Sequence, residues 1–131
     1  MTRASAGRLR LRAEELRAPV LERVVAALAA RVDLPLDRLA DAQLVSSVVV
    51  RGATRHLVDG VLCIDLETDG GAVGLAVGPL PEGEGRQMVS ESLPGVGPVL
   101  ERLVDEWSVE PLGEGAEVLR LSIGAGARAT S

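Results

Sequence analysis

Residues 61–77 read VLCIDLETDGGAVGLAV, in which two apolar runs flank a polar turn that contains Asp69-Gly70. An Asp-Gly pair between two such runs is typical of a tight β-hairpin, because both residue types tolerate the positive φ angles that its turn requires. The sequence therefore predicts two neighbouring antiparallel strands, at 61–67 and 72–77.

Periodicity places the remaining elements. Residues 8–12 read RLRLR, and this strict alternation predicts a strand with one buried face. Elsewhere apolar residues recur at the spacing of an amphipathic helix. The expected elements are a strand at 8–12, helices at 14–32 and 37–56, strands at 61–67 and 72–77, a long loop at 78–95 with a short helix near 87–91, a helix at 98–107, and strands at 109–112 and 116–123.

This order of elements predicts an α+β fold. Strands that gather in hairpins, with helices between them, favour a two-layer α/β sandwich whose mostly antiparallel sheet is covered by helices on one face. The other face of the sheet is then open, and an open face is a natural place for a partner to dock. We expect one domain at 8–123, with a flexible N-terminus at 1–7 and a flexible tail at 124–131.

Composition excludes several classes of function. The chain has 131 residues and a net charge of −5, with one Trp and no Phe or Tyr, so it lacks the cationic surface and the aromatic platform of nucleic-acid binders. It contains no apolar run near ~20 residues and no export signal, which predicts a cytoplasmic protein without a membrane partner. Cys63 is the only cysteine and is expected to be buried as a small hydrophobe, as suits a reducing compartment.

Two segments carry a resemblance to a known family. Residues 44–56 read LVSSVVVRGATRH and residues 93–106 read LPGVGPVLERLVDE. With the order of elements, they make the chain similar to the anti-sigma-factor serine/threonine kinases, small bacterial proteins of the Bergerat ATP-binding fold. The resemblance spans roughly 9–123 and implies a Bergerat-like architecture for the whole domain.

The family places a Glu, an Asn and commonly a His on successive turns of its second helix, all facing the nucleotide. There the Asn and the phosphates hold Mg²⁺ through oxygen ligands, and the Glu acts as a base or positions water. Aligned on His56, the matching positions are Val48 for the Glu and Gly52 for the Asn. Valine has no titratable group and glycine has no side chain. The Asp-x-Gly-x-Gly segment that reads adenine in the family corresponds to 77–81, which contains no acid.

The remaining nucleotide signal is Gly95-Val96-Gly97, which precedes the helix at 98–107. Backbone N–H groups at a helix N-terminus can cradle phosphate, although Pro98 contributes none. We therefore name Gly95, Gly97 and His56 as candidate cofactor-binding residues, and we expect no metal site and no resident cofactor.

Other polar side chains form no recognisable catalytic set. Ser46 and Ser47 have no neighbouring base in the sequence and are expected to be helix residues, one of them bonded to a backbone carbonyl. Arg51 and Arg55, joined by Arg31 or Arg38, are a candidate site for an anionic partner, with solvated surface charge as the alternative.

These observations favour a non-catalytic, regulatory protein-binding module that resembles the anti-sigma-factor kinases and has lost most of its nucleotide-binding residues. The resemblance implies a homodimer and a protein partner such as a sigma factor or an antagonist domain. Two alternatives stay open: a divergent ATP-binding kinase that uses Mg²⁺, with an acid such as Asp41 or Glu91 in place of the missing pair, or a small-ligand sensor. The sensor's apolar pocket would be lined by Val45, Val48, Val49 and Gly52.

Overall fold

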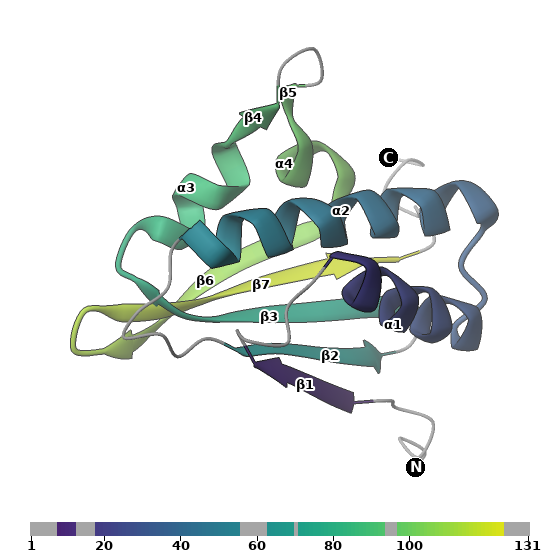
Figure 1. Cartoon of the computed structure of the whole chain (residues 1–131), viewed down its shortest axis with the longest axis horizontal. Helices are drawn as coiled ribbons and strands as arrows, with labels where there is room; N and C mark the ends of the chain where they lie inside the picture. The colour runs from purple at the N-terminus through teal and green to yellow at the C-terminus, as the bar shows by residue number, and fades with distance from the viewer. Residues whose placement is uncertain (1–7, 13–17, 56–62, 70, 94–96, 125–131) are drawn as a thin grey trace.

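The computed structural model describes residues 8–12, 18–55, 63–69, 71–93 and 97–124. In chain order the elements are β1 (Arg8–Arg12), α1 (Ala18–Arg31), α2 (Leu36–Arg55), β2 (Cys63–Asp69), β3 (Ala72–Pro81), α3 (Glu84–Ser90), β4 (Ser92–Leu93), β5 (Gly97–Pro98), α4 (Val99–Leu103), β6 (Glu106–Gly113) and β7 (Ala116–Ile123) (Figure 1).

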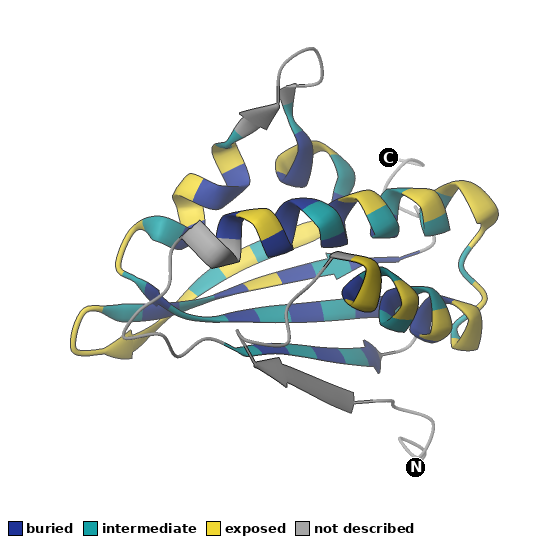
Figure 2. Ribbon diagram, in the orientation of Figure 1, coloured by how far each residue is buried: buried dark blue, intermediate teal, exposed yellow. Residues whose placement is uncertain are grey.

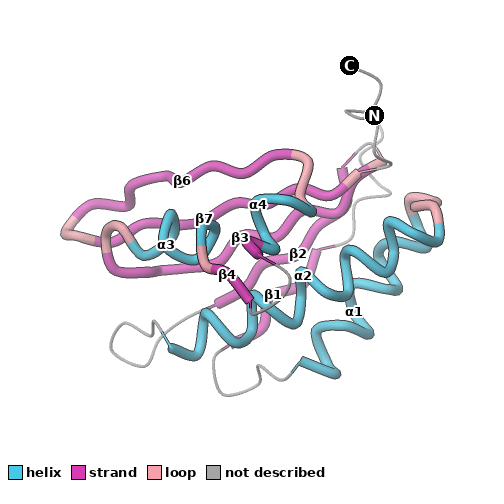
Figure 3. Tube along the Cα trace, turned by 90° about the horizontal axis from the view of Figure 1, so that it is seen from above, coloured by secondary structure: helices cyan, strands magenta, loops and turns pink. Residues whose placement is uncertain are grey.

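The main sheet has five strands in the order β1-β2-β3-β7-β6, and each neighbouring pair is antiparallel. The helices lie on one side of it, with α1 and α2 packed together and α3 and α4 beside them (Figures 1 and 3). α1 contacts β2 and β3, whereas α3 contacts β3 and β7. The predicted α+β class and two-layer sandwich are therefore confirmed.

The core lies between the sheet and the helices. Along β2, Ile64 and Leu66 are fully buried while their neighbours at 63, 65 and 67 are half-exposed, and β3 and β7 alternate in the same way (Figure 2). This period of two also places Cys63, which is half-buried on the opposite face from Ile64. The expectation that Cys63 is buried in the core was wrong, because strand alternation outweighs the apolar run in which the residue lies.

α2 forms despite its β-branched residues. Val45 and Val49 are fully buried and Val48 and Val50 nearly so, and packing of this face against the core outweighs the strand propensity of valine. The first turn of α2 is closed by a bond from the Leu39 N–H to the Pro35 carbonyl. The predicted helices at 14–32 and 37–56 are confirmed as α1 and α2 over the described residues.

The segment 78–95 is more ordered than its glycines and prolines indicate. β3 continues to Pro81 through a register shift between Val77 and Leu80, and α3 and β4 follow it. β2 begins opposite Gly78, so the prolines beyond that point interrupt no hydrogen bond to β2. The predicted long loop was wrong, but the short helix expected within it is present as α3.

The predicted helix at 98–107 ends early. α4 stops at Leu103, Val104 is extended, and the Asp105 N–H bonds the Ser122 carbonyl. Trp107 then lies in β6 opposite Leu121. Pairing with β7 thus takes over the second half of a segment whose apolar spacing fits a helix.

The ends of the domain differ from the expectation in one place. Gly124, which the sequence assigned to a loose tail, is buried, and both its N–H and its carbonyl are hydrogen-bonded. The segments 1–7 and 125–131 lie outside the described residues. Over the part of the chain that is described, no helix has the length and apolar character needed to cross a membrane.

Candidate functional site

The α2 face to which the resemblance assigns a nucleotide is part of the hydrophobic core. Val48 and Gly52 lie one turn apart and are both buried, Val48 with 8% of its surface exposed. Two residues before Val48, the Ser46 hydroxyl donates to the Ala42 carbonyl at 2.8 Å in a fully buried contact. This agrees with the structural role expected for one of the two serines and leaves that hydroxyl occupied.

Met88 of α3 fills the space next to Gly52. A Cβ atom added at Gly52 would lie 2.9 Å from Met88 Cε and 3.4 Å from its Cγ. Met88 is 1% exposed, as is its neighbour Val89. Any larger side chain at position 52 therefore requires Met88 to move, and the space beside Gly52, to which the resemblance assigns an Asn side chain, is occupied by an apolar side chain of the same chain.

α3 is attached to β7 through a buried carboxylate. The Gly85 N–H donates to Glu117 Oε2 at 2.8 Å, and Glu117 is 6% exposed. A Cβ atom at Gly85 would lie 2.8 Å from that oxygen, so glycine permits the close approach. The turn before the helix passes through Gly83, whose φ of 93° lies in the left-handed region.

The structure brings together only part of the predicted nucleotide site. Val48 and Gly52 are adjacent on α2, whereas His56 and Gly95 lie outside the described residues. Gly97 belongs to the short strand β5, paired with Leu93, and comes two residues before α4 begins. At the start of α4, Pro98 makes no side-chain capping bond.

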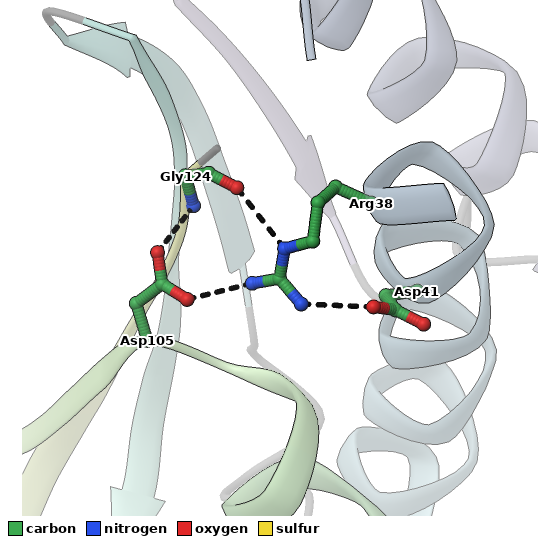
Figure 4. Close-up of polar contacts among 4 residues, drawn as sticks. All are labelled: Arg38, Asp41, Asp105 and Gly124. Carbon is green, nitrogen blue, oxygen red and sulfur yellow. Dashed lines mark hydrogen bonds and ion pairs between the residues drawn. The ribbon is translucent and has the colours of Figure 1, made fainter. Parts of the chain in front are cut away.

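A second polar cluster connects α2 to the end of the sheet (Figure 4). Arg38 contacts Asp105 Oδ1 through Nη2 at 2.6 Å and Asp41 Oδ2 through Nη1 at 2.8 Å. Its Nε donates to the Gly124 carbonyl at 3.1 Å, and the Gly124 N–H donates to Asp105 Oδ2 at 2.8 Å. Arg38 is thus held inside the fold, and its assignment to an anion site with Arg51 is wrong.

The open face of the sheet carries a shallow depression of about 360 Å³. Small residues of β3 form its floor, and charged side chains of the neighbouring strands surround it. The residues that line it include Asp65, Glu67, Gly74, Ala76, Glu106 and Arg120. Among the described residues, no group of three or more His, Cys, Asp or Glu side chains could hold a metal ion.

A scan against protein-family models finds no matching family, and a search of the curated proteins finds no match. The functional interpretation therefore rests on the residues themselves.

Sequence reasoning missed the roles of Met88, Glu117 and Arg38. Glu117 carried a usable signal, since it shares the period-two spacing of Leu119 and Leu121, both of which face the core. Met88 carried none, because its partner Gly52 is distant in the sequence. Arg38 has a local partner in Asp41, but its contacts with Asp105 and Gly124 join residues that are distant in the sequence.

Proposed function

We propose that this chain is a non-catalytic regulatory module that binds a protein partner and is related in architecture to the anti-sigma-factor kinases. One observation carries the proposal: Val48 and Gly52 stand where those kinases have Glu and Asn, and Met88 lies 2.9 Å from the point where a Cβ at Gly52 would be. This face offers neither an oxygen ligand for Mg²⁺ nor space for a phosphate.

Two further features support the loss of nucleotide chemistry. The segment 77–81 contributes no acid for adenine, and Val77 and Leu80 within it are fully buried. Asp41, one of the two acids named for a divergent kinase, is ion-paired with Arg38 at 2.8 Å.

Calorimetric titration of the folded protein with ATP and a nonhydrolysable analogue, with and without Mg²⁺, tests this proposal. We expect no heat and no change in Tm, while circular dichroism confirms that the protein is folded. Micromolar, Mg²⁺-dependent binding would refute the non-catalytic assignment and favour the divergent kinase. Titration with a purified sigma factor, and separately with an antagonist domain, from the genome that encodes the chain tests the partner class.

The open face of the sheet supports a homodimer. From β2 to β6 its charges follow the strand order: Asp65 and Glu67 on β2, small residues on β3, Arg120 on β7, and Glu106 and Glu110 on β6. Within one copy, Arg120 is paired with Glu110 at 3.0 Å, and both side chains are about half exposed. Rotation by half a turn about an axis along β3 places the β2 acids of one copy over Arg120 of the second. The small β3 residues allow the two faces to approach closely, and such self-complementarity is what a twofold interface requires.

Analytical ultracentrifugation tests the dimer. Arg120→Glu should weaken self-association by about tenfold or more, and adding Asp65→Arg should restore it, since the charge pair is then reversed. Arg51→Glu, an exposed charge change on α2, is the matched control and should leave association unchanged. A monomeric wild-type protein, or equal effects of Arg120→Glu and Arg51→Glu, would refute this interface.

A further inference from the structure

β6 forms one border of the main sheet. Over the residues that the structure describes, it has β7 on one side and no strand on the other (Figure 3). Alternate backbone N–H and C=O groups of such a strand point away from the sheet, where they can pair with another extended chain. Pro111 has no N–H, and the pairing of β6 with β7 shifts register between Pro111 and Gly113. The regular part of this border is therefore Glu106–Glu110, which we call the β6 edge.

The two faces of the β6 edge differ in chemistry. Trp107 and Val109 lie opposite buried leucines of β7, so they belong to the face that the helices cover, and both are half-buried. Glu106, Ser108 and Glu110 alternate with them on the open face and are exposed. A strand added beside β6 would thus place one set of alternate side chains near two carboxylates and the other set near an apolar pair.

Arg86 of α3 indicates which set should be cationic. Its guanidinium carbon lies 5.6 Å from the centroid of the Trp107 ring, on the face that the helices cover. A cation added beside Trp107 would meet this positive charge, whereas an aliphatic side chain would extend the apolar contact of the ring. The cations of an added strand are therefore favoured only on the open face.

The fold contains an example of a strand that pairs with such a border. β2 has a similar pattern to the β6 edge, with acids at 65 and 67 alternating with buried aliphatic residues at 64 and 66. Its neighbour β1 has the sequence RLRLR. The register places arginines opposite the two acids, Arg8 opposite Glu67 and Arg10 opposite Asp65. Opposite charges directly across a strand pair are stabilising, so alternating arginine and leucine suits an acidic border.

A second β6 edge does not suit this border. Antiparallel pairing of two such edges over their full length places Glu106 of one copy opposite Glu110 of the other, and like charges at this distance are destabilising. We propose that the β6 edge binds an extended segment of a partner protein in which arginine or lysine alternates with aliphatic residues. The segment adds a sixth strand to the sheet, with its cations beside the two glutamates and its aliphatic side chains beside Trp107 and Val109. This inference rests on the proposed protein-binding function and specifies the site and the chemistry of the partner.

Two peptides of equal composition test the recognition with the full chain. The probe is acetylated RLRLRLR, and the matched control is acetylated RRRRLLL, which has the same charge without the alternation. By fluorescence anisotropy, the alternating peptide should bind about tenfold more tightly, because only it presents cations and leucines on opposite faces of a strand. It should also shift the emission of Trp107, the only tryptophan, to shorter wavelength. Equal affinities for the two peptides would overturn the proposal.

A charge reversal and hydrogen exchange locate the binding. Glu106→Arg should weaken binding of RLRLRLR about tenfold, whereas Asp37→Arg, the same charge change at an exposed position of α2, should alter it by less than about twofold. The bound peptide should slow exchange of amides within Glu106–Glu110 about tenfold and leave those of β1 unchanged. Equal effects of the two substitutions, or protection of β1 in place of β6, would overturn the β6 edge.

The outcomes separate this inference from the proposed function. Binding of ATP would refute the non-catalytic assignment whatever the peptides do. A purified partner protein that binds the wild type and Glu106→Arg with equal affinity would overturn the β6 edge and leave the protein-binding function intact.

Discussion

Removal of the Arg38 guanidinium is predicted to destabilise the domain strongly. Arg38→Met keeps most of the aliphatic stem but deletes the contacts to Asp105, Asp41 and the Gly124 carbonyl. The side chains of Arg38 and Asp105 are only 13% and 18% exposed, so the substitution strands a carboxylate that is largely shielded from water. Breaking a fully buried pair costs about 3 to 5 kcal/mol, and partial exposure reduces this to about 2 to 3 kcal/mol.

Urea denaturation followed by the fluorescence of the single tryptophan measures this loss. For a domain of this length the change corresponds to a fall in Tm of about 6 to 15 °C. Arg23→Met is the matched control, because Arg23 is exposed on α1 and the contacts of an exposed arginine should contribute less than about 1 kcal/mol. If Arg38→Met costs no more than Arg23→Met, the argument from burial is refuted.

Three further substitutions test close packing and one ring contact. Gly52→Asn should destabilise by about 1 to 3 kcal/mol, because Met88 must move, and adding Met88→Ala should recover part of the loss in a double-mutant cycle. Gly78→Ala should destabilise the fold by a similar amount, about 1 to 3 kcal/mol, because its Cβ atom would lie 3.1 Å from a β7 carbonyl oxygen. Gly71→Ala is the control: a Cβ atom there meets no atom within 4 Å, so stability should change by less than about 0.5 kcal/mol. Both are measured by urea denaturation. Arg86→Ala removes a cation that lies 5.6 Å from the centroid of the tryptophan ring, and should shift the tryptophan emission while costing no more than about 1 kcal/mol.

The candidate site was only partly predictable. The absence of acid and amide groups at Val48 and Gly52 follows from the sequence alone once the helix is aligned on His56. The closure of that face does not, because the sequence predicts a short helix near 87–91 without showing which element that helix packs against. Packing on the core and the bond from Gly85 to Glu117 place this helix, α3, with Met88 against Gly52.

Element type was predictable wherever one period dominated. The alternation at 8–12 and the helical spacing at 37–56 each gave the right element, because a period of two and a period of 3.6 bury different sets of residues. Prediction failed at 98–107, where Val99, Leu100, Leu103 and Val104 fit a helix but the next residues pair with β7. A short apolar stretch is compatible with both periods, and only pairing with a neighbouring strand decides whether it forms a helix or a strand.

The sequence by itself therefore determined the α+β class, the hairpin turns, the buried faces of the strands and helices, and the absence of an acid or amide side chain at positions 48 and 52 of α2. These depend on residues close to one another along the chain. Only the tertiary structure decided which residues meet across the fold: Met88 at Gly52, Glu117 at Gly85, and Arg38 at Asp105, a contact between residues 67 positions apart. Such contacts follow from strand order and helix packing, and local periodicity contains no information about either.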